Sequence, residues 1–507
     1  MADRVRLEYV AWHVDSRSAL EKRGDLWVEG PEAPRRGEAV SPVETTARSF
    51  VIVPPQITKF EGPFFTYPFV NGATRADVID GTIHARLGDL FDGLTSDTVV
   101  RGAIYTWNFA PFDELVGAQE GPVEFTEKIL DLVVERRADA EFIVDSNFDA
   151  ASQDPAAGAG SSGGVGTADA VKAAFADRGI PLHVDEGIGV QHAKYFLFSE
   201  LHFPEGSPAP FPRDMRHVVA VLSLNVTSFD FYSTGNMIVM HGNEELYDAF
   251  FDLWNYTKVV QSPTGYAHVK RDCGDVKLYS FPVDQPPHGD TGWGWLNWIV
   301  SSIGIPTDFL EVLADWARYA VHPTDYFFDI FGVGIEDLWE LFLAAAEKDP
   351  VADEIRQIID LMPLGGAHTK IRFAHSYWDR EAVIQGLMLA SWLGADVKVL
   401  TGDPVVLGVS YTAYAAYQLK AGFIDVRYLP TNAPRDGDMH HKYFLVDATY
   451  DIRGDSRIRK LVFTGSHNLH YDSLEADDEV MVRIENRSVY NAYLDDWNRL
   501  WADARSW

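Results

Sequence analysis

Two short segments of the sequence each place a histidine two residues before a lysine. In the first, His192 and Lys194 precede an apolar run, and in the second, His440 and Lys442 precede a similar run. The eight-residue segments around these pairs agree at five positions. Side chains alternate along a strand, so a histidine and a lysine at this spacing are expected on one face. Two such pairs, each an imidazole beside a fixed cation, favour chemistry on an anionic substrate.

The similarity between the two segments extends well beyond the histidines and lysines. Asn225 lies opposite Asn468 at an offset of 243 residues, and the same offset sets Asn236 opposite Glu479. The register continues without a gap through a predicted strand and the helix after it. Further matched pairs are Asn243 with Asn486, Tyr247 with Tyr490 and Trp254 with Trp497. One offset kept over this length indicates an internal duplication.

A phosphodiester substrate would use all of these residue types. Negative charge accumulates on the phosphate oxygens during displacement, and two lysines and two asparagines can stabilise it without a metal. One neutral histidine can attack phosphorus, and a second, protonated histidine can donate to the departing alcohol. We therefore predict no metal and no cofactor. His441 and His467 flank the motifs, but their spacing is not one of a recognised zinc site.

The second copy carries a longer pattern that identifies a known family. His440-x-Lys442-x-x-x-x-Asp447 resembles the HxKxxxxD motif of the phospholipase D superfamily, and it is followed by Gly-Ser-x-Asn at Asn468 and by Glu479 at the family's usual spacing. The resemblance implies catalytic roles for the histidines, lysines and asparagines of both copies. It implies structural roles near the site for Asp447 and Ser466. The first copy departs from the pattern, because Ser199 stands where the aspartate is expected.

The resemblance also implies a division of roles between the two histidines. In such enzymes the residue 11 positions after the motif asparagine orients the histidine of the opposite half. By that rule Glu479 holds His192, which becomes the nucleophile, and Asn236 holds His440, which becomes the acid and then the base. A carboxylate raises the pKa of a histidine partner more than an amide does. This arrangement is similar to that of tyrosyl-DNA phosphodiesterases.

The remainder of the chain alternates predicted strands and helices, which indicates an α/β fold. We expect two homologous phospholipase D-like halves, each a mostly parallel mixed sheet flanked by helices, packed as one pseudo-twofold unit. The predicted divisions are a β-rich N-terminal segment (1–76), a first half (77–260), a strand and helical connector (261–350) and a second half (351–507). Strands are expected at 98–107, 140–145, 237–240, 369–374, 396–400 and 480–484, and helices at 123–137, 380–393 and 411–421.

The substrate is less constrained by the sequence than the reaction. The connector contains an aromatic stretch at 293–346, in which Trp295 and Trp298 are candidate contacts for acyl chains. The first hypothesis is therefore phospholipid headgroup hydrolysis or transphosphatidylation, with peripheral contact to a membrane. The alternatives are a nucleic-acid end-processing phosphodiesterase or nuclease, and a catalytically inactive phosphate-binding member of the fold.

Composition sets limits on the partners and the compartment. The 507 residues are 46% hydrophobic and 23% charged, typical of a globular protein. The net charge of −32 opposes non-specific binding to nucleic acid. A single cysteine, Cys273, precludes an intramolecular disulfide. No signal peptide or transmembrane run is recognised, so we expect a cytoplasmic monomer.

Overall fold

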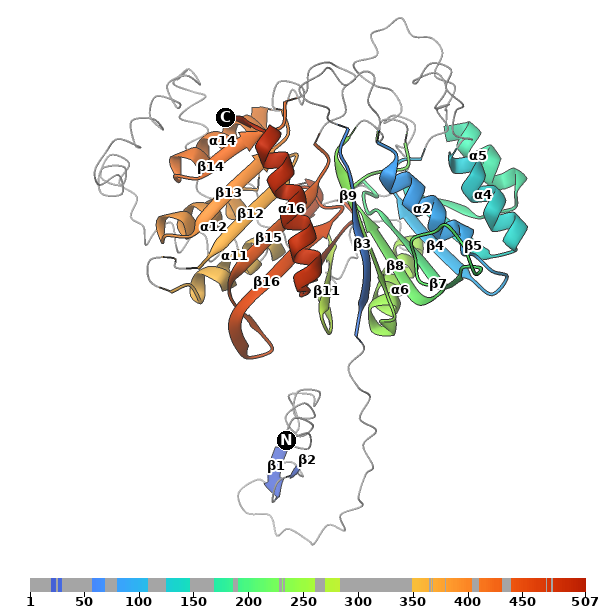
Figure 1. Ribbon diagram of the computed structural model, residues 1–507, viewed down its shortest axis with the longest axis horizontal. Helices are drawn as coiled ribbons and strands as arrows, with labels where there is room; N and C mark the ends of the chain where they lie inside the picture. Colours follow the sequence, from blue (N-terminus) through green and yellow to red (C-terminus); the bar gives the residue numbers. More distant parts are fainter. Residues whose placement is uncertain are drawn as a thin grey trace, which may run out of the picture. The chain divides into compact units, whose positions relative to one another are not determined.

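The fold was analysed in a computed structural model of the chain (Figure 1). The structure describes residues 20–23, 26–29, 57–68, 80–107, 125–145, 168–185, 190–227, 230, 233–259, 270–282, 349–363, 366, 368–378, 380–403, 410–430, 439–470, 472–475 and 477–507. The chain divides into two compact units, Met1–Pro55 and Gln56–Trp507. In the first unit, β1 (Leu20–Arg23) and β2 (Leu26–Glu29) form an antiparallel pair.

The second unit contains two mixed sheets among its described residues. The first sheet has the strand order β3-β9-β8-β7-β4-β5-β6. Its strands are β3 (Lys59–Thr66), β4 (Val99–Ile104), β5 (Asp139–Asp145), β6 (Leu182–Asp185), β7 (Tyr195–His202), β8 (Asp214–Leu222) and β9 (Gly235–His241).

The second sheet repeats this order from β11 to β14 and adds one strand at each edge, giving β10-β11-β17-β16-β15-β12-β13-β14-β18. Its strands are β10 (Lys270–Cys273), β11 (Val276–Phe281), β12 (Lys370–His375), β13 (Asp396–Thr401), β14 (Asp425–Tyr428), β15 (Lys442–Ile452), β16 (Asp455–Gly465), β17 (Glu479–Ile484) and β18 (Arg505–Ser506). Seven strands in the same spatial order confirm the α/β fold and the duplication expected from the sequence.

Pairing within the sheets is less parallel than expected. Parallel pairs occur between β4, β5 and β6 and between β12, β13 and β14. The remaining described pairs are antiparallel, including the run β7-β8-β9 and its counterpart β15-β16-β17. The expectation of mostly parallel pairing therefore holds only where helices connect the strands. Consecutive strands without a crossover helix return as antiparallel neighbours.

Helices cover the outer and inner faces of the two sheets. The outer helices of the first half are α2 (Thr82–Asp92), α4 (Phe125–Arg136) and α5 (Ala168–Asp177), and those of the second are α11 (Pro350–Asp360), α12 (Glu381–Trp392) and α14 (Ser410–Ala421). Between the sheets lie α6 (Glu244–Val259) and α16 (Arg487–Asp503), which contact strands of both halves. Asn243 and Asn486 accept backbone N–H groups at the starts of α6 and α16, so the duplicated asparagines are equivalent N-caps.

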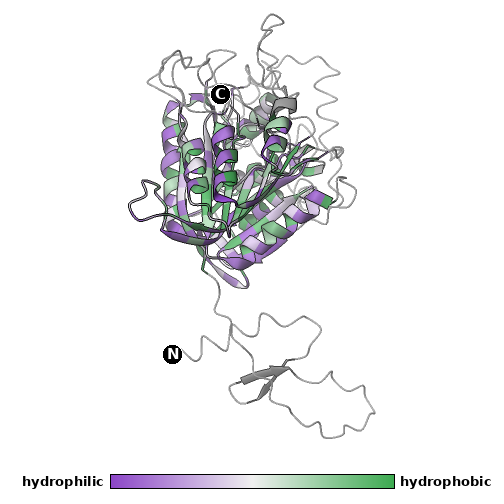
Figure 2. Cartoon of the chain, turned by 90° about the vertical axis from the view of Figure 1, so that its right-hand side faces the viewer, coloured by the Kyte–Doolittle hydropathy of each residue, from purple (hydrophilic) through white to green (hydrophobic). Residues whose placement is uncertain are grey.

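The buried apolar residues form three clusters, of which the middle one joins the halves. One cluster lies under the outer helices of each half. The third contains Trp254 and Ile238 from the first half together with Val480, Tyr493 and Trp497 from the second. In Figure 2 the helices alternate hydrophilic and hydrophobic residues, and much of the strand ribbon is hydrophobic. Burial of a shared apolar core makes the two halves one folding unit.

Several predictions fall partly or wholly outside the described residues. The aromatic stretch 293–346, with Trp295 and Trp298, lies outside them, as does most of the N-terminal segment. Strands β10 and β11 come from the predicted connector and extend the second sheet. The proposed domain boundaries remain a prediction. Among the described helices, none is long and apolar enough to cross a bilayer.

Candidate active site

The two His-Lys pairs meet at matching edges of the sheets. Strand β7 starts directly after Lys194, and β15 starts at Lys442. Each pairs antiparallel with a strand that ends at this edge, so Tyr195 lies beside Ala103 on β4 and Lys442 beside His375 on β12. The prediction that each pair lies within a strand is therefore wrong for both histidines and for Lys194, which precede the strands.

Backbone hydrogen bonds between the halves hold the segments that carry the histidines. The His192 N–H donates to the Asp478 carbonyl oxygen at 2.9 Å, and the His440 N–H donates to the Thr234 carbonyl oxygen, also at 2.9 Å. Each histidine is therefore attached to the residue just before a strand of the opposite half, His192 before β17 and His440 before β9. The site needs both halves because each positions the other's histidine.

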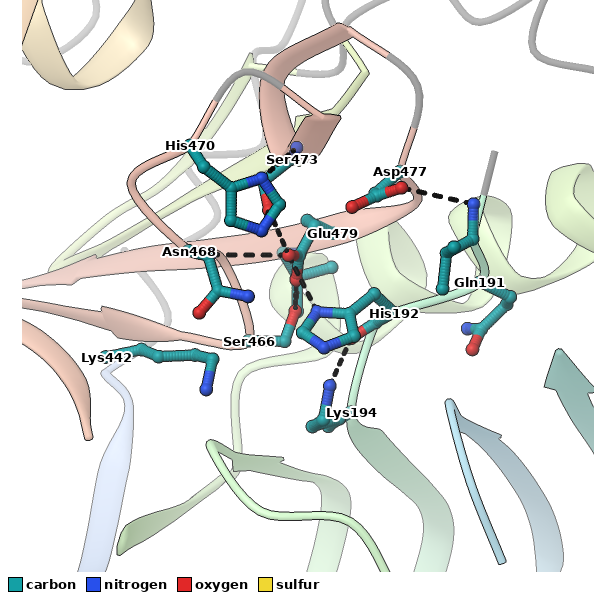
Figure 3. A network of polar contacts seen from close by, with 12 residues as sticks. Gln191, His192, Lys194, Lys442, Ser466, Asn468, His470, Ser473, Asp477 and Glu479 are labelled. Carbon is teal, nitrogen blue, oxygen red and sulfur yellow. Dashed lines mark hydrogen bonds and ion pairs between the residues drawn. The ribbon is translucent and has the colours of Figure 1, made fainter. Parts of the chain in front are cut away.

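Glu479 contacts His192 across the boundary between the halves, as the family pattern implies. The His192 Nδ1 atom lies 2.7 Å from Glu479 Oε1 (Figure 3). A buried carboxylate fixes the ring with Nδ1 protonated, which leaves the lone pair on Nε2. The ring is therefore oriented to use Nε2 as a nucleophile or base.

Hydroxyl and amide donors of the second half hold the Glu479 carboxylate in place. Ser466 Oγ donates to Oε2 at 2.6 Å, and Ser473 Oγ donates to Oε1 at 2.8 Å. The backbone N–H of Asn468 also donates to Oε1, at 3.3 Å. Burial raises the pKa of Glu479, while Lys194 and the hydroxyls of Ser466 and Ser473 act in the opposite direction. The carboxylate is thus positioned before any substrate binds.

The two lysines bring buried positive charge to the histidines. Lys194 Nζ donates to the His192 carbonyl oxygen at 2.8 Å, and Lys442 Nζ donates to the His440 carbonyl oxygen at 3.3 Å. Neither lysine is exposed to solvent. In Figure 3 Lys442 extends from the second half toward the region where His192 and Lys194 lie. The cations are placed to attract an anionic group between the histidines.

Burial and these cations shift the pKa values of the site. Burial, followed by Lys194 and Lys442, holds the pKa of His192 well below 6.5. The pKa of His440 is lowered by burial and by the same two lysines. Burial lowers the pKa of Lys194 to about 7, although Glu479 opposes this shift. Both histidines are therefore neutral at neutral pH, which suits a nucleophile.

Asn236 does not hold His440, which corrects the expectation from the family spacing. Asn236 Nδ2 donates to Thr464 Oγ1 at 2.8 Å, and its Oδ1 lies 3.3 Å from His441 Nδ1. His440 Nδ1 has no hydrogen-bond partner among the described residues. The side-chain hydrogen bonds of Asn236 within the described residues thus go to the packing between the halves and not to the motif histidine.

A shift of one residue in strand register explains this difference. Leu222 on β8 pairs with Met237, whereas the matching Gly465 on β16 pairs with Met481, one residue beyond the position that the sequence offset predicts. The backbone of Asn236 therefore corresponds to Val480, and a one-residue shift turns a side chain to the opposite face of a sheet. Gly235 corresponds to Glu479, and a Cβ atom there would lie 2.4 Å from Leu224 Cγ.

The remaining predicted residues divide between the site and its surroundings. Asn225 follows β8 and Asn468 follows the equivalent strand β16, and the side-chain Oδ1 of each is buried without a hydrogen-bond partner in the described part of the chain. Asp447 lies 3.4 Å from Lys460 Nζ on the neighbouring strand, consistent with a structural role. Ser199, at the equivalent position of the first copy, accepts the Val99 N–H at 2.8 Å.

The motif analysis did not identify Tyr105 and His470, which act on His192, or Ser473, which donates to Glu479. The Tyr105 ring lies 5.0 Å from the His192 ring between centroids, and Lys194 Nζ lies 5.5 Å from the Tyr105 centroid. His470 contributes to the lowered pKa of His192, and its Nδ1 accepts the Ser473 N–H at 3.3 Å. Tyr105 directly follows β4, a parallel strand whose carboxyl end is a common ligand position. No comparable signal marks His470 or Ser473.

Comparisons with known proteins agree with these motifs. Residues 361–501, which contain the second motif, match the family model for the PLD-like domain of cardiolipin synthase. No curated protein sequence matches the chain significantly.

Several solved structures are similar to parts of the chain. Nuc from Salmonella typhimurium, a phospholipase D family member, is 21% identical with a TM-score of 0.25, over 31% of this chain and 88% of that one. Phosphatidylserine synthase from Haemophilus influenzae Rd KW20 is 10% identical with a TM-score of 0.46, over 89% and 87%. Polyphosphate kinase from Porphyromonas gingivalis is 11% identical with a TM-score of 0.42, over 88% of this chain and 50% of that one.

The matched domain contains a complete motif, and the first half repeats its fold and its histidine and lysine. The second half therefore contains a PLD-like domain, and with both motifs in one site the chain as a whole resembles the phospholipase D superfamily.

Proposed function

We propose that this chain is a metal-independent phosphodiesterase that acts through a covalent phosphohistidine on His192. The observation that carries the proposal is the hydrogen bond of His192 Nδ1 to the buried Glu479 carboxylate. That contact prepares Nε2 for attack and stabilises the positive charge that develops on the ring. His440, attached to the opposite half, lacks a carboxylate at the equivalent position and is assigned the acid and base role.

The reaction proceeds in two balanced steps. First, Nε2 of His192 attacks phosphorus, the bond from phosphorus to the leaving oxygen breaks, and protonated His440 gives that oxygen its proton. The negative charge of the bound phosphodiester raises the pKa of His440, which supplies this proton. In the second step a water or alcohol attacks phosphorus, His440 takes its proton, and the P–N bond returns its electron pair to His192. Lys194 and Lys442 stabilise the phosphate oxygens throughout.

The proposed substrate is a phospholipid, by headgroup hydrolysis or transfer of the phosphatidyl group to another alcohol. Support comes from the match of residues 361–501 to the PLD-like domain of cardiolipin synthase. The net charge of −32 also opposes long-range attraction of nucleic acid. Nucleic-acid cleavage is the competing outcome of the substrate test.

The mechanism is tested with bis(p-nitrophenyl) phosphate in EDTA. Because p-nitrophenolate leaves without a proton, His440→Ala should release about one equivalent of p-nitrophenol and then stall with the phosphoryl group on His192. His192→Ala should release none. Steady-state turnover should fall by roughly 10²- to 10⁴-fold in His440→Ala. Mass spectrometry of the quenched protein locates the adduct.

A matched control replaces an exposed histidine of β7. His202→Ala should turn over like the wild type, because His202 pairs with Asp214 away from the site. Full activity in either motif variant, or loss of wild-type activity in EDTA, would contradict the mechanism. Phosphatidylcholine micelles and single-stranded oligonucleotides, compared at equal enzyme concentration, then decide between the lipid and nucleic-acid substrates.

A further inference from the structure

The first half has no side chain where the second half has Glu479, but it does supply another carboxylate nearby. Gly235 takes the backbone position of Glu479, and Leu224 fills the space beside it. Asp230 lies five residues after Asn225 and is only 2% exposed. Its Oδ1 accepts the backbone N–H of Asn225 at 3.2 Å, and its Oδ2 accepts the Thr227 hydroxyl.

The two hydrogen bonds of Asp230 resemble two of those that Glu479 makes. In the second half the N–H of the motif residue Asn468 donates to Glu479 Oε1 at 3.3 Å, and a hydroxyl from Ser473 donates to the same oxygen. In the sequence alignment of the halves Ser473 stands opposite Asp230. The first half therefore has its carboxylate, Asp230, where the second half has Ser473, and the second half has Glu479 where the first has Gly235. In both halves the backbone N–H of the motif asparagine donates to the carboxylate.

We propose that Asp230 is a carboxylate that the first half contributes to the active site, and that it is a positioning residue for Asn225 and for the charge on Lys194 and Lys442. The inference rests on the proposed function for its catalytic meaning. Its electrostatic part can be tested whether or not the protein turns over a diester.

Electrostatic interactions connect Asp230 with both motif lysines. Lys194 and Lys442 each favour the ionised form of Asp230, although burial raises its pKa. Asp230 in turn raises the pKa of Lys194, which burial lowers to about 7. The other charged groups that act on Lys194 are Glu479, Asp477 and Lys442. Without Asp230, Lys194 would lose its proton at lower pH, and less cationic charge would face the phosphate above neutrality.

The test substitutes Asp230→Asn, which keeps the shape and an oxygen acceptor for the Asn225 N–H but removes the charge. Lysine labelled with ¹³C at Cε is titrated by NMR, with Lys194 assigned from a Lys194→Arg variant. We expect a lower pKa for Lys194 in Asp230→Asn and a value near that of the wild type in Asp230→Glu. In the diesterase assay the basic limb of the kcat profile should move to lower pH.

The matched control is Asp252→Asn, which removes one exposed carboxylate on α6 that pairs with Arg271. It should leave both the Lys194 titration and the kcat profile unchanged. Asp230→Asn with an unaltered Lys194 titration would overturn the inference, as would a kcat profile that falls uniformly in parallel with a lower Tm. Wild-type protein that cleaves no diester would contradict the proposed function alone, because the Lys194 titration still decides the role of Asp230.

Discussion

At the scale of single residues, burial of the ionised Glu479 side chain lowers the stability of the fold. The side chain is buried, and burial raises its pKa above the usual value near 4.5. A carboxyl whose folded pKa is raised contributes stability below its unfolded pKa, and that contribution is lost as pH rises through the folded pKa. At neutral pH the ionised form therefore weakens the fold while it serves His192.

Glu479→Gln tests this balance between stability and activity. The amide cannot stabilise a positive His192 ring, so activity should fall by roughly 100-fold or more. At pH 7 the variant should unfold at the same or a higher urea concentration than the wild type. As pH falls from 7 toward 4.5, the free energy of unfolding of the wild type should increase relative to that of the variant. The free energy of unfolding of the wild type minus that of the variant should therefore be larger at pH 5 than at pH 7. The opposite order would contradict a raised pKa for Glu479.

At the scale of elements, the register of β9 and β17 decides which side chains reach the site. Both strands are buried along their whole length and carry mostly apolar residues. Such strands have little polar pattern to specify register, so packing specifies it. In β9 the contact of Gly235 with Leu224 belongs to the register that turns Asn236 away from His440.

Gly235→Ala tests the packing that accompanies this register. A Cβ atom would lie 2.4 Å from Leu224 Cγ, so overpacking should lower the free energy of unfolding by about 1–3 kcal/mol. Gly88→Ala in α2 is the matched control, since its Cβ would meet Phe125 at 3.4 Å. Alanine favours a helix, so the control should be neutral or stabilising by up to about 1 kcal/mol. Equal losses for both variants in urea unfolding would exclude the proposed clash.

At the scale of the whole molecule, one site is shared by two halves with a common core. Backbone hydrogen bonds cross between the halves at both histidines, and the middle apolar cluster contains residues of both sheets. Groups that act in one reaction are strongly non-additive when they are removed. The two motifs should therefore behave as one catalytic unit.

The double variant His192→Ala/His440→Ala checks this unit. Its steady-state turnover of bis(p-nitrophenyl) phosphate should be no lower than that of His192→Ala, because a single loss already stops the covalent step. Separate sites in the two halves would instead leave each single variant with a share of the activity and make the losses add.

The sequence by itself determined the duplication, the strand and helix order and the motif residues of the site, because these depend on local periodicity and on repeated residue types. It also identified the contact of Glu479 with His192, through the family spacing. The tertiary structure decided the strand register, which the constant offset between the two halves of the sequence does not predict. A one-residue shift between β9 and β17, accompanied by the packing of Gly235 against Leu224, removed Asn236 from the site. With Gly235 at the backbone position of Glu479, the carboxylate that we assign to the first half is Asp230. The sequence could not show this, because strand register depends on contacts between neighbouring strands and not on residue spacing within one strand.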